Sequence, residues 1–214
     1  MLYTKNVHTC CAVITAFLLA TLSIDRIGGS STGAPTQACA TMTPEHGFEP
    51  QLPISSPFKT EIPAGNKVLM DEAVQLELRS QNSLVPFKGY LVMAFDQNND
   101  TQPIGSFKLP SDGQLIDCIG GVRNAATHKL NNAKQLATVD WVPPKNYMGT
   151  VVFRTTFVLN ATTYWVKTES IAVSFVMAPV TQPTVPTTTP SSASQSSSMW
   201  AVPLVASLLA FLTL

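Results

Sequence analysis

The sequence predicts an all-β protein in which two antiparallel sheets pack face to face as a sandwich. About seven or eight short segments alternate apolar and polar residues, which is the pattern of strands with one buried face. Clusters of Gly, Pro and Asn separate these segments, and this part of the sequence contains no convincing amphipathic helix. Two cysteines in the same region predict one disulfide.

The first residues are typical of a secretory signal peptide, which we assign to 1–28. Lys5 precedes an apolar run, and small and polar residues follow that run. The run is short for a membrane crossing. A buried N-terminal helix is the alternative, although no other predicted helix is available to pack against it. After the signal peptide, residues 30–180 are predicted to form one domain, which is long enough to bury a hydrophobic core.

Cleavage would remove Cys10 and Cys11, so that Cys39 and Cys118 remain. In an oxidising compartment an isolated pair is most simply a disulfide, and two free thiols are the alternative. The bridge would tie a proline-rich irregular segment to the middle of the domain. Closing such a long loop stabilises the fold by roughly 4 to 5 kcal/mol in the chain-entropy model.

Apolar residues that recur at every second position indicate where the strands lie in the sequence. Val74, Leu76 and Leu78 alternate with polar residues, which predicts a strand with one solvent-exposed face. Segment 87–96 is apolar on both faces, which favours a central strand. The predicted strands are 73–80, 87–96, 104–109, 115–119, 135–141, 149–160 and 163–175.

Two further predictions concern side-chain direction. In the last strand, Ile171, Val173 and Phe175 are expected to face the same side. Aromatic residues in strands more often belong to a core than to a binding face. Trp141 and Trp165 are therefore predicted to be buried.

No catalytic or cofactor-binding motif occurs, so neither an enzyme nor a cofactor is expected. His46 and His128 each follow a bridge cysteine, and the disulfide would bring these candidate binding residues near one another. They would form a metal-binding or pH-sensing pair, or simply be hydrogen-bonded polar residues beside the bridge. The second alternative is favoured, because a zinc site needs three or four ligands.

Charge and sequons indicate the kind of surface. Lys and Arg number 13, as do Asp and Glu, without a run of either sign, which argues against nucleic acid as a partner. Asn99 and Asn160 each begin an Asn-x-Thr sequon directly after a predicted strand. A hairpin turn would expose both asparagines, and N-glycosylation is expected at both.

The C-terminal part resembles a stalk followed by a lipid-attachment signal. Segment 181–198 consists mostly of Ser, Thr and Pro and lacks charge, so it is expected to remain extended and O-glycosylated. Segment 199–214 is apolar and too short for a comfortable membrane crossing. Small residues upstream favour a glycosylphosphatidylinositol (GPI) anchor attached at Ser191 or Ser192. A short uncleaved transmembrane anchor is the alternative.

Several short motifs occur in a characteristic order: GAPTQACATMTPEH, FKGYLVMA, GSF, LIDC, ATHKL, DWVPP and VVFRTTFVLNATTYW. With these motifs the chain, from about Gly33 to Val176, resembles the reeler (reelin-type) domain family. That resemblance implies an immunoglobulin-like sandwich, a Cys39–Cys118 disulfide and family histidine positions filled by His46 and His128. It also implies that Trp141 and Pro143 close a strand.

The reeler resemblance implies an extracellular role. The domain opens spondins and ferric-chelate-reductase-like membrane proteins, and it stands nearly alone in arthropod defence proteins. Because no haem-binding or cytochrome region is recognised here, reductase activity is not expected.

Two functional hypotheses remain open. The first is a GPI-anchored recognition protein at the extracellular face of the plasma membrane, with secreted or single-pass forms as alternatives. Its ligand would be microbial polysaccharide, lipopolysaccharide or extracellular matrix, contacted by loops such as 112–114 and 131–134. The second is a structural or adhesive coat glycoprotein. Fold analogy alone does not decide between them.

Overall fold

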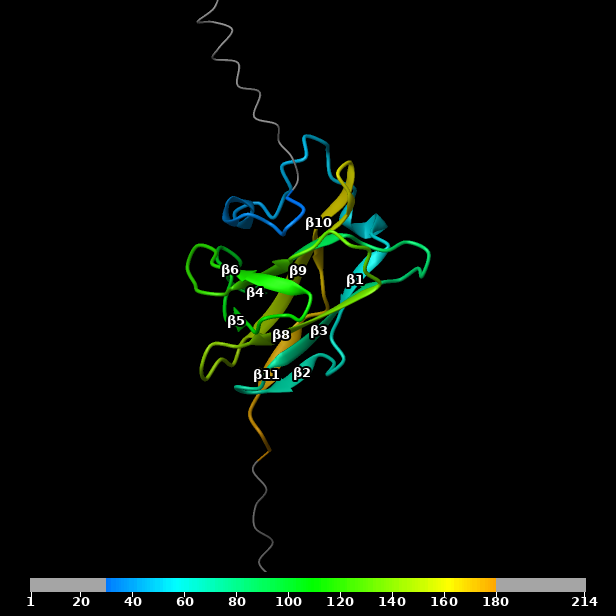
Figure 1. Cartoon of the computed structure of the whole chain (residues 1–214). Helices are drawn as coiled ribbons and strands as arrows, with labels where there is room; N and C mark the ends of the chain where they lie inside the picture. The colour runs from blue at the N-terminus through cyan, green and yellow to red at the C-terminus, as the bar shows by residue number, and fades with distance from the viewer. Residues whose placement is uncertain (1–29, 180–214) are drawn as a thin grey trace, which may run out of the picture. The chain divides into compact units, whose positions relative to one another are not determined.

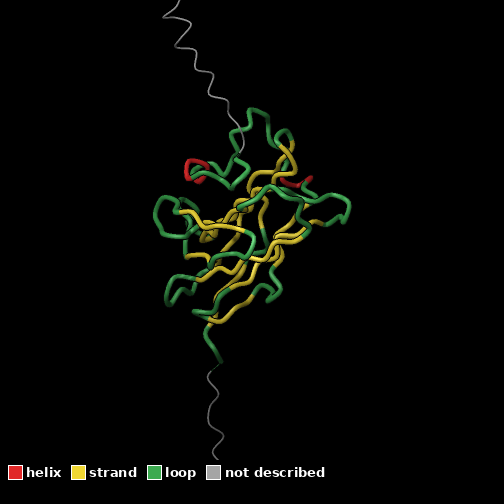
Figure 2. The backbone as a smooth tube through the Cα atoms, viewed as in Figure 1, coloured by secondary structure: helices red, strands yellow, loops and turns green. Residues whose placement is uncertain are grey.

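The computed structural model describes residues 30–179. The predicted signal peptide (1–28), the predicted stalk (181–198) with Ser191 and Ser192, and the predicted anchor segment (199–214) lie outside the described residues. Within 30–179, strands predominate and only two short 3-10 helices occur (Figure 2). No helix in this range is long and apolar enough to cross a membrane.

The strands form two sheets packed as a sandwich (Figure 1). One sheet has the order β1-β3-β8-β5, and the other has the order β2-β11-β9-β4-β7-β6, with β10 paired to β9. The elements are η1 (Thr36–Cys39), η2 (Pro53–Ser55), β1 (Phe58–Glu61), β2 (Lys67–Leu69), β3 (Val74–Ser80), β4 (Gly89–Asp96), β5 (Ser106–Phe107), β6 (Gly113–Ile116), β7 (Ala125–His128), β8 (Leu136–Val142), β9 (Thr150–Asn160), β10 (Thr163–Glu169) and β11 (Val173–Val176).

The predicted class, an all-β immunoglobulin-like sandwich with one disulfide, is confirmed. One pairing departs from the antiparallel prediction, because β2 and β11 run parallel along Lys67–Leu69 and Ser174–Val176. The other strand pairs are antiparallel.

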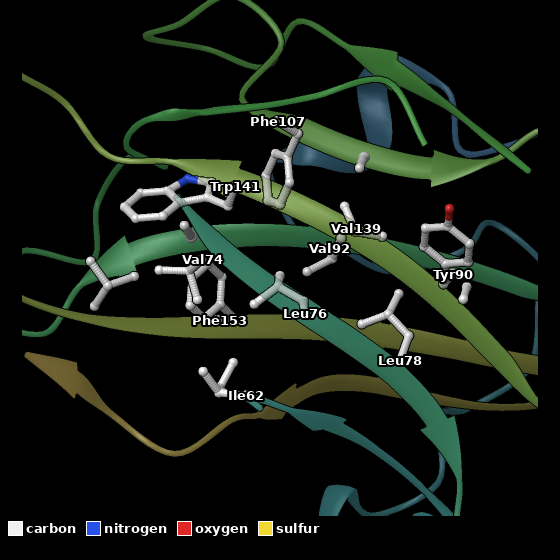
Figure 3. Close-up of a cluster of buried hydrophobic side chains, with 14 of the residues drawn as sticks. Ile62, Val74, Leu76, Leu78, Tyr90, Val92, Phe107, Val139, Trp141 and Phe153 are labelled. Carbon is white, nitrogen blue, oxygen red and sulfur yellow. The ribbon is translucent and has the colours of Figure 1, made fainter. Parts of the chain in front are cut away.

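The main core lies between the two sheets. In β3, Val74, Leu76 and Leu78 are fully buried, as the alternation predicted. Val74 is paired with Trp141 of β8, whose indole is fully buried and packs edge-on against Phe153 at a centroid distance of 5.3 Å (Figure 3). The Trp141 indole N–H donates to the carbonyl oxygen of Ile104 (3.0 Å), so its one polar atom is paired. Both Trp141 and Trp165 are buried, as predicted.

A second apolar cluster lies on the outer face of the seven-stranded sheet. Strand β4 is buried on both faces: Val92 and Ala94 point into the main core, whereas Leu91, Met93 and Phe95 belong to the second cluster. Residues 34–42, which we call the N-terminal segment, cover this outer face, and they appear in blue in Figure 1. The sandwich therefore carries a partial third layer.

The disulfide holds the N-terminal segment in place. Cys39 at the end of η1 is bonded to Cys118 in the loop after β6, with the two Cα atoms 5.6 Å apart. Farther along, the hydroxyl of Thr156 in β9 donates to the carbonyl oxygen of Met42 (2.7 Å). Both sheets, both clusters and the disulfide lie within one compact unit that ends at Ala178, so 30–180 contains the interactions on which the fold depends.

The prediction of one continuous strand over 163–175 is wrong. The chain forms β10 and then β11, both along β9, with an interruption at 170–172. The register shifts after Trp165, near Lys167, whose φ is +56°. The Ser170 hydroxyl then accepts a hydrogen bond from the backbone N–H of Phe153 (3.1 Å). This hydroxyl takes the place of the backbone carbonyl oxygen that a continuous strand would offer as acceptor. As a result Ile171 is 53% exposed, while Val173 and Phe175 are buried as predicted.

Other boundaries also differ from the prediction. In place of the predicted strand 104–109, the structure has the shorter β5. In place of the predicted strand 115–119 it has β6, which begins and ends earlier, so Cys118 lies beyond the end of the strand. Strands β1, β2 and β7 were not predicted. Strand β7 reads AATH and is buried throughout, so it lacks the alternation that marks a half-exposed strand.

We expect Trp141→Ala to lower the free energy of unfolding by about 3 to 5 kcal/mol, because truncating a buried aromatic side chain leaves a cavity. Urea denaturation of the secreted domain would measure this change. Leu136→Ala, on the same strand but 44% exposed, is the matched control and should change stability far less. A Trp141→Ala variant as stable as the wild type would contradict the core assignment.

Candidate functional site

A cavity of about 310 Å³ opens between the N-terminal segment and the outer face of the seven-stranded sheet. Its floor is formed by Gly89 and Leu91 of β4 and by Thr156 and Val158 of β9. Ala34, Pro35, Ala38 and Met42 form the opposite wall, and His128 closes the side next to β7. This volume is at the small end of the range for ligand-binding pockets.

The N-terminal segment enters this position through tight backbone contacts. Gly33 has a φ of +108°, and a Cβ there would lie 2.4 Å from the carbonyl oxygen of His128, so both backbone conformation and space favour glycine. The next residue, Ala34, donates its backbone N–H to the Thr127 hydroxyl (3.0 Å). That hydroxyl donates in turn to the carbonyl oxygen of Tyr90 (2.6 Å), which links the segment to β7 and β4.

His128 is a buried wall of the cavity, with 7% of its surface exposed. Its Nδ1 accepts the backbone N–H of Tyr90 (3.2 Å). Burial lowers the pKa of His128, and the nearby Lys134 ammonium lowers that pKa further. A Cβ on Gly89 would lie 2.8 Å from the imidazole, so the absent side chain at position 89 makes room for the ring.

His46 lines the same cavity from the N-terminal side and is half-buried. Its imidazole meets the Tyr164 ring edge-on, with ring centroids 5.5 Å apart. Burial lowers the pKa of His46, while a hydrogen bond to the backbone of Ala161 opposes this effect. The Nδ1 atom is buried and has no hydrogen-bond partner within the described chain.

Both histidines line the same cavity. No group of three or more His, Cys, Asp or Glu side chains within residues 30–179 is arranged to hold a metal ion. Because burial disfavours the charged imidazole, the cavity presents two neutral rings at neutral pH.

Both sequons occupy exposed turns. In each, the asparagine Oδ1 accepts the hydroxyl of the threonine two residues on: Thr101 to Asn99 (2.8 Å) and Thr162 to Asn160 (2.9 Å). These bonds engage the amide oxygen and leave the amide nitrogen, where a glycan would attach, at the surface. Asn160 also lies on the cavity rim, so a glycan there would stand beside the opening.

The two segments suggested for recognition, 112–114 and 131–134, have different structural surroundings. In 131–134, Asn131 lines the cavity, but Lys134 is buried and its ammonium donates to the carbonyl oxygens of Leu130 (2.7 Å) and Asn132 (3.0 Å). Lys134 therefore holds its own loop together. In 112–114, Gly113 and Gln114 belong to strand β6, and the Gln114 side chain donates to the carbonyl oxygen of Thr32, just before the N-terminal segment.

Sequence reasoning did not identify Lys88, Leu91 and Val158 as cavity residues. The sequence signal for such a site lay in segment 87–96, because a strand with apolar residues on both faces needs other parts of the chain to cover each face. The apolar pattern alone does not show which residues form the cover, or that a cavity remains beneath it.

A disulfide-bonded β-sandwich with a covering N-terminal segment defines the structural class of the protein. The Reeler domain family model matches residues 37–181, and the chain belongs to this family. The human F-spondin reeler domain, a solved structure, covers 60% of this chain and 94% of its own at a TM-score of 0.50 and 12% identity. That likeness shows the fold alone.

Among curated relatives, the putative defense protein of Bombyx mori is 33% identical over 178 residues, covering 80% of this chain and 99% of its own. The putative defense protein Hdd11 of Hyphantria cunea is 32% identical over 161 residues, covering 72% and 93%. The putative ferric-chelate reductase 1 homolog of Drosophila melanogaster is 30% identical over 184 residues. That match spans 84% of this chain but only 28% of the reductase homologue.

We expect the stability of the domain to depend on pH through the two histidines. Both pKa values lie below 6.5 in the folded state, so the unfolded chain binds more protons as the pH falls below that value. The stabilisation is present above about pH 6.5 and is lost as the pH falls towards the folded-state pKa values. Urea denaturation between about pH 7.5 and 5.5 would show the decrease, in a range where few other groups titrate.

The same experiment separates the contributions of the two histidines to the pH dependence of stability. His128→Gln should flatten the pH dependence more than His46→Gln, because His128 is the more deeply buried imidazole. If the doubly substituted protein shows the wild-type slope, groups other than these histidines cause the pH dependence.

Proposed function

We propose that this protein is an extracellular recognition protein of the defence type, tethered to the outer face of the plasma membrane. The observation that carries the proposal is the match to relatives of nearly the same extent that are named defense proteins. The proposed ligands are exposed microbial molecules, polysaccharide or lipopolysaccharide, with extracellular-matrix components as the other class. Binding of sugars would use the polar rim of the cavity and its surrounding loops, since loops on a rigid sandwich commonly carry recognition.

A non-enzymatic role is part of this proposal. Within residues 30–179, the groups with perturbed pKa values lie in the core, in surface ion pairs or in the cavity wall. The hydrogen bonds of His46 and His128 in this range do not link either imidazole to a nucleophile and to a third group that orients the imidazole. The reductase names belong to relatives of which this chain spans about a quarter.

A structural coat glycoprotein is the second candidate. Both sequons occupy exposed turns, and the sequence of 181–198 is typical of an O-glycosylated stalk, so glycans would cover much of such a protein. The two candidates differ in one measurable property, because a coat protein needs no selective ligand.

We expect phosphatidylinositol-specific phospholipase C to release the protein from intact cells, because 199–214 is short for a stable membrane span and small residues precede it. Flow cytometry before and after the enzyme would measure the release. Substituting both Ser191 and Ser192 by bulky residues should reduce surface display. Retention after the enzyme, with Leu214 still detected by mass spectrometry, would indicate a transmembrane anchor instead.

We expect the secreted 30–180 domain to bind microbial polysaccharide or lipopolysaccharide with little dependence on salt. The chain carries no net charge, and an attraction built on several lysines would weaken as salt screens exposed charges. Binding isotherms at low and physiological salt would test this. Asn131→Ala at the cavity should weaken binding, and Asn66→Ala, in an exposed turn outside the cavity lining, should not. No binding to any microbial glycan or lipid at micromolar protein would favour the coat function.

A further inference from the structure

The interior of the cavity is apolar, whereas its rim is polar. Met42 and Leu91 are almost completely buried and belong with Ala38 to the second apolar cluster, and Val158 adds aliphatic surface from β9. The rim carries exposed polar residues: Ser30, Ser31, Glu45, Lys88, Asn131 and Asn160. A ligand that matches this arrangement has an apolar body and a polar end.

Two polar groups of the cavity wall are already hydrogen-bonded within the protein. The Thr156 hydroxyl donates to the carbonyl oxygen of Met42 (2.7 Å), and His128 Nδ1 accepts the N–H of Tyr90 (3.2 Å). His46 Nδ1 lacks a partner but is itself covered by protein atoms. A sugar ring placed inside would leave several hydroxyl groups unpaired, at a cost of about 1 to 3 kcal/mol for each buried group. A hydrocarbon chain incurs no such penalty.

The volume of the cavity limits the size of the apolar body. A space of 310 Å³ corresponds to about ten water molecules at their liquid volume, and a methylene group fills a similar space. One acyl chain of about ten carbons therefore fits, and a second chain does not.

A basic side chain stands at the opening. Lys88 is exposed on the rim, and the ion pairs within residues 30–179 do not include its ammonium. Its backbone N–H donates to the carbonyl oxygen of Val158 (2.8 Å), so it sits directly beside the apolar floor. The Lys134 ammonium contacts the Lys88 carbonyl oxygen (3.3 Å) and adds positive charge nearby. Glu45 carries the opposite charge on the other wall, next to His46.

We propose that this cavity binds a single medium-length acyl chain of an anionic amphiphile, with the chain between Leu91 and Val158 and the head group beside Lys88. The inference deepens the recognition function proposed above and rests on it for its biological meaning. A free fatty acid and an acylated microbial glycolipid share this chemistry. Strand β11, the last strand of the domain, ends at the side of the sandwich opposite the N-terminal segment (Figure 1).

Isothermal titration of the secreted 30–180 domain with fatty acids of six to fourteen carbons tests the pocket directly. Each added methylene should tighten binding about two- to four-fold, up to a plateau near ten carbons. Decanol in place of decanoate isolates the contribution of the head group. Lys88→Gln should weaken decanoate binding about two- to five-fold without weakening decanol binding, because an exposed charge pair contributes modestly. Lys67→Gln, an exposed lysine outside the cavity lining, is the control.

Val158→Phe should fill the cavity and reduce decanoate affinity at least ten-fold. Val152→Phe is the matched control, because Val152 is equally half-buried on the same face of β9 but does not line the cavity. Circular dichroism and urea denaturation would establish that both variants are folded. Loss of binding in Val158→Phe alone supports the proposal. Equal affinity in both variants, or affinity that does not change with chain length, overturns it.

Binding of the same variants to purified lipopolysaccharide and to unacylated polysaccharide separates the two sources and the two proposals. Selective loss of lipopolysaccharide binding in Val158→Phe identifies an acylated glycolipid as the source. Decanoate binding without any microbial ligand identifies free fatty acid and overturns the defence recognition function, but not the pocket. Microbial binding that is unaffected by Val158→Phe, together with decanoate binding that does not depend on Val158, keeps the recognition function and overturns the pocket.

Discussion

Strand β4 has two apolar faces, and the rest of the structure depends on covering both of them. The four-stranded sheet covers the face that carries Val92 and Ala94, but Leu91, Met93 and Phe95 face outward. Burial of apolar surface stabilises the fold by about 25 cal/mol per Å², so an uncovered face would forfeit much of the stability available to a single domain. The N-terminal segment supplies the cover, and the disulfide keeps this short irregular chain from detaching.

The cavity follows from the way in which this cover is attached. The segment is fixed by the disulfide at Cys39, by the Met42 carbonyl on Thr156 and by the Gly33–Ala34 contact with β7, and it crosses β4 and β9 between these points. Its backbone, which contains Pro35 and the short 3-10 helix η1, does not pair with the sheet as a strand would, so side chains alone fill the space. Where those side chains are small, as at Ala34 and Ala38, the floor stays open.

Most strands that the sequence predicted are those in which burial changes from residue to residue. Val74, Leu76, Leu78 and Trp141 alternate with polar neighbours because one face of each strand meets solvent. Strand β4, buried on both faces, was predicted from its long apolar run, whereas β7 is buried throughout and has only four residues, too few to form such a run. The break at 170–172 was missed because a side-chain hydroxyl replaces a strand acceptor. His46 and His128 were named from their positions after the two bridge cysteines, and the family resemblance implied the same two residues. The cavity was not foreseen, since its walls are distant in sequence and meet only through tertiary packing.

The same geometry separates the roles of the two ends of the sandwich. Strand β11, which leads out of the domain, pairs with the first residues of β9 at Thr150 and Val151, whereas the cavity uses Thr156, Val158 and Asn160 near its last residues. With the tether and the ligand proposed above, a pull on β11 would act on one end of β9 and the ligand on the other. Strand β9 is paired with β4 along eight consecutive residue pairs, so the sheet hydrogen bonds between the two ends would share such a load. The N-terminal segment is held separately, by its disulfide to the loop after β6.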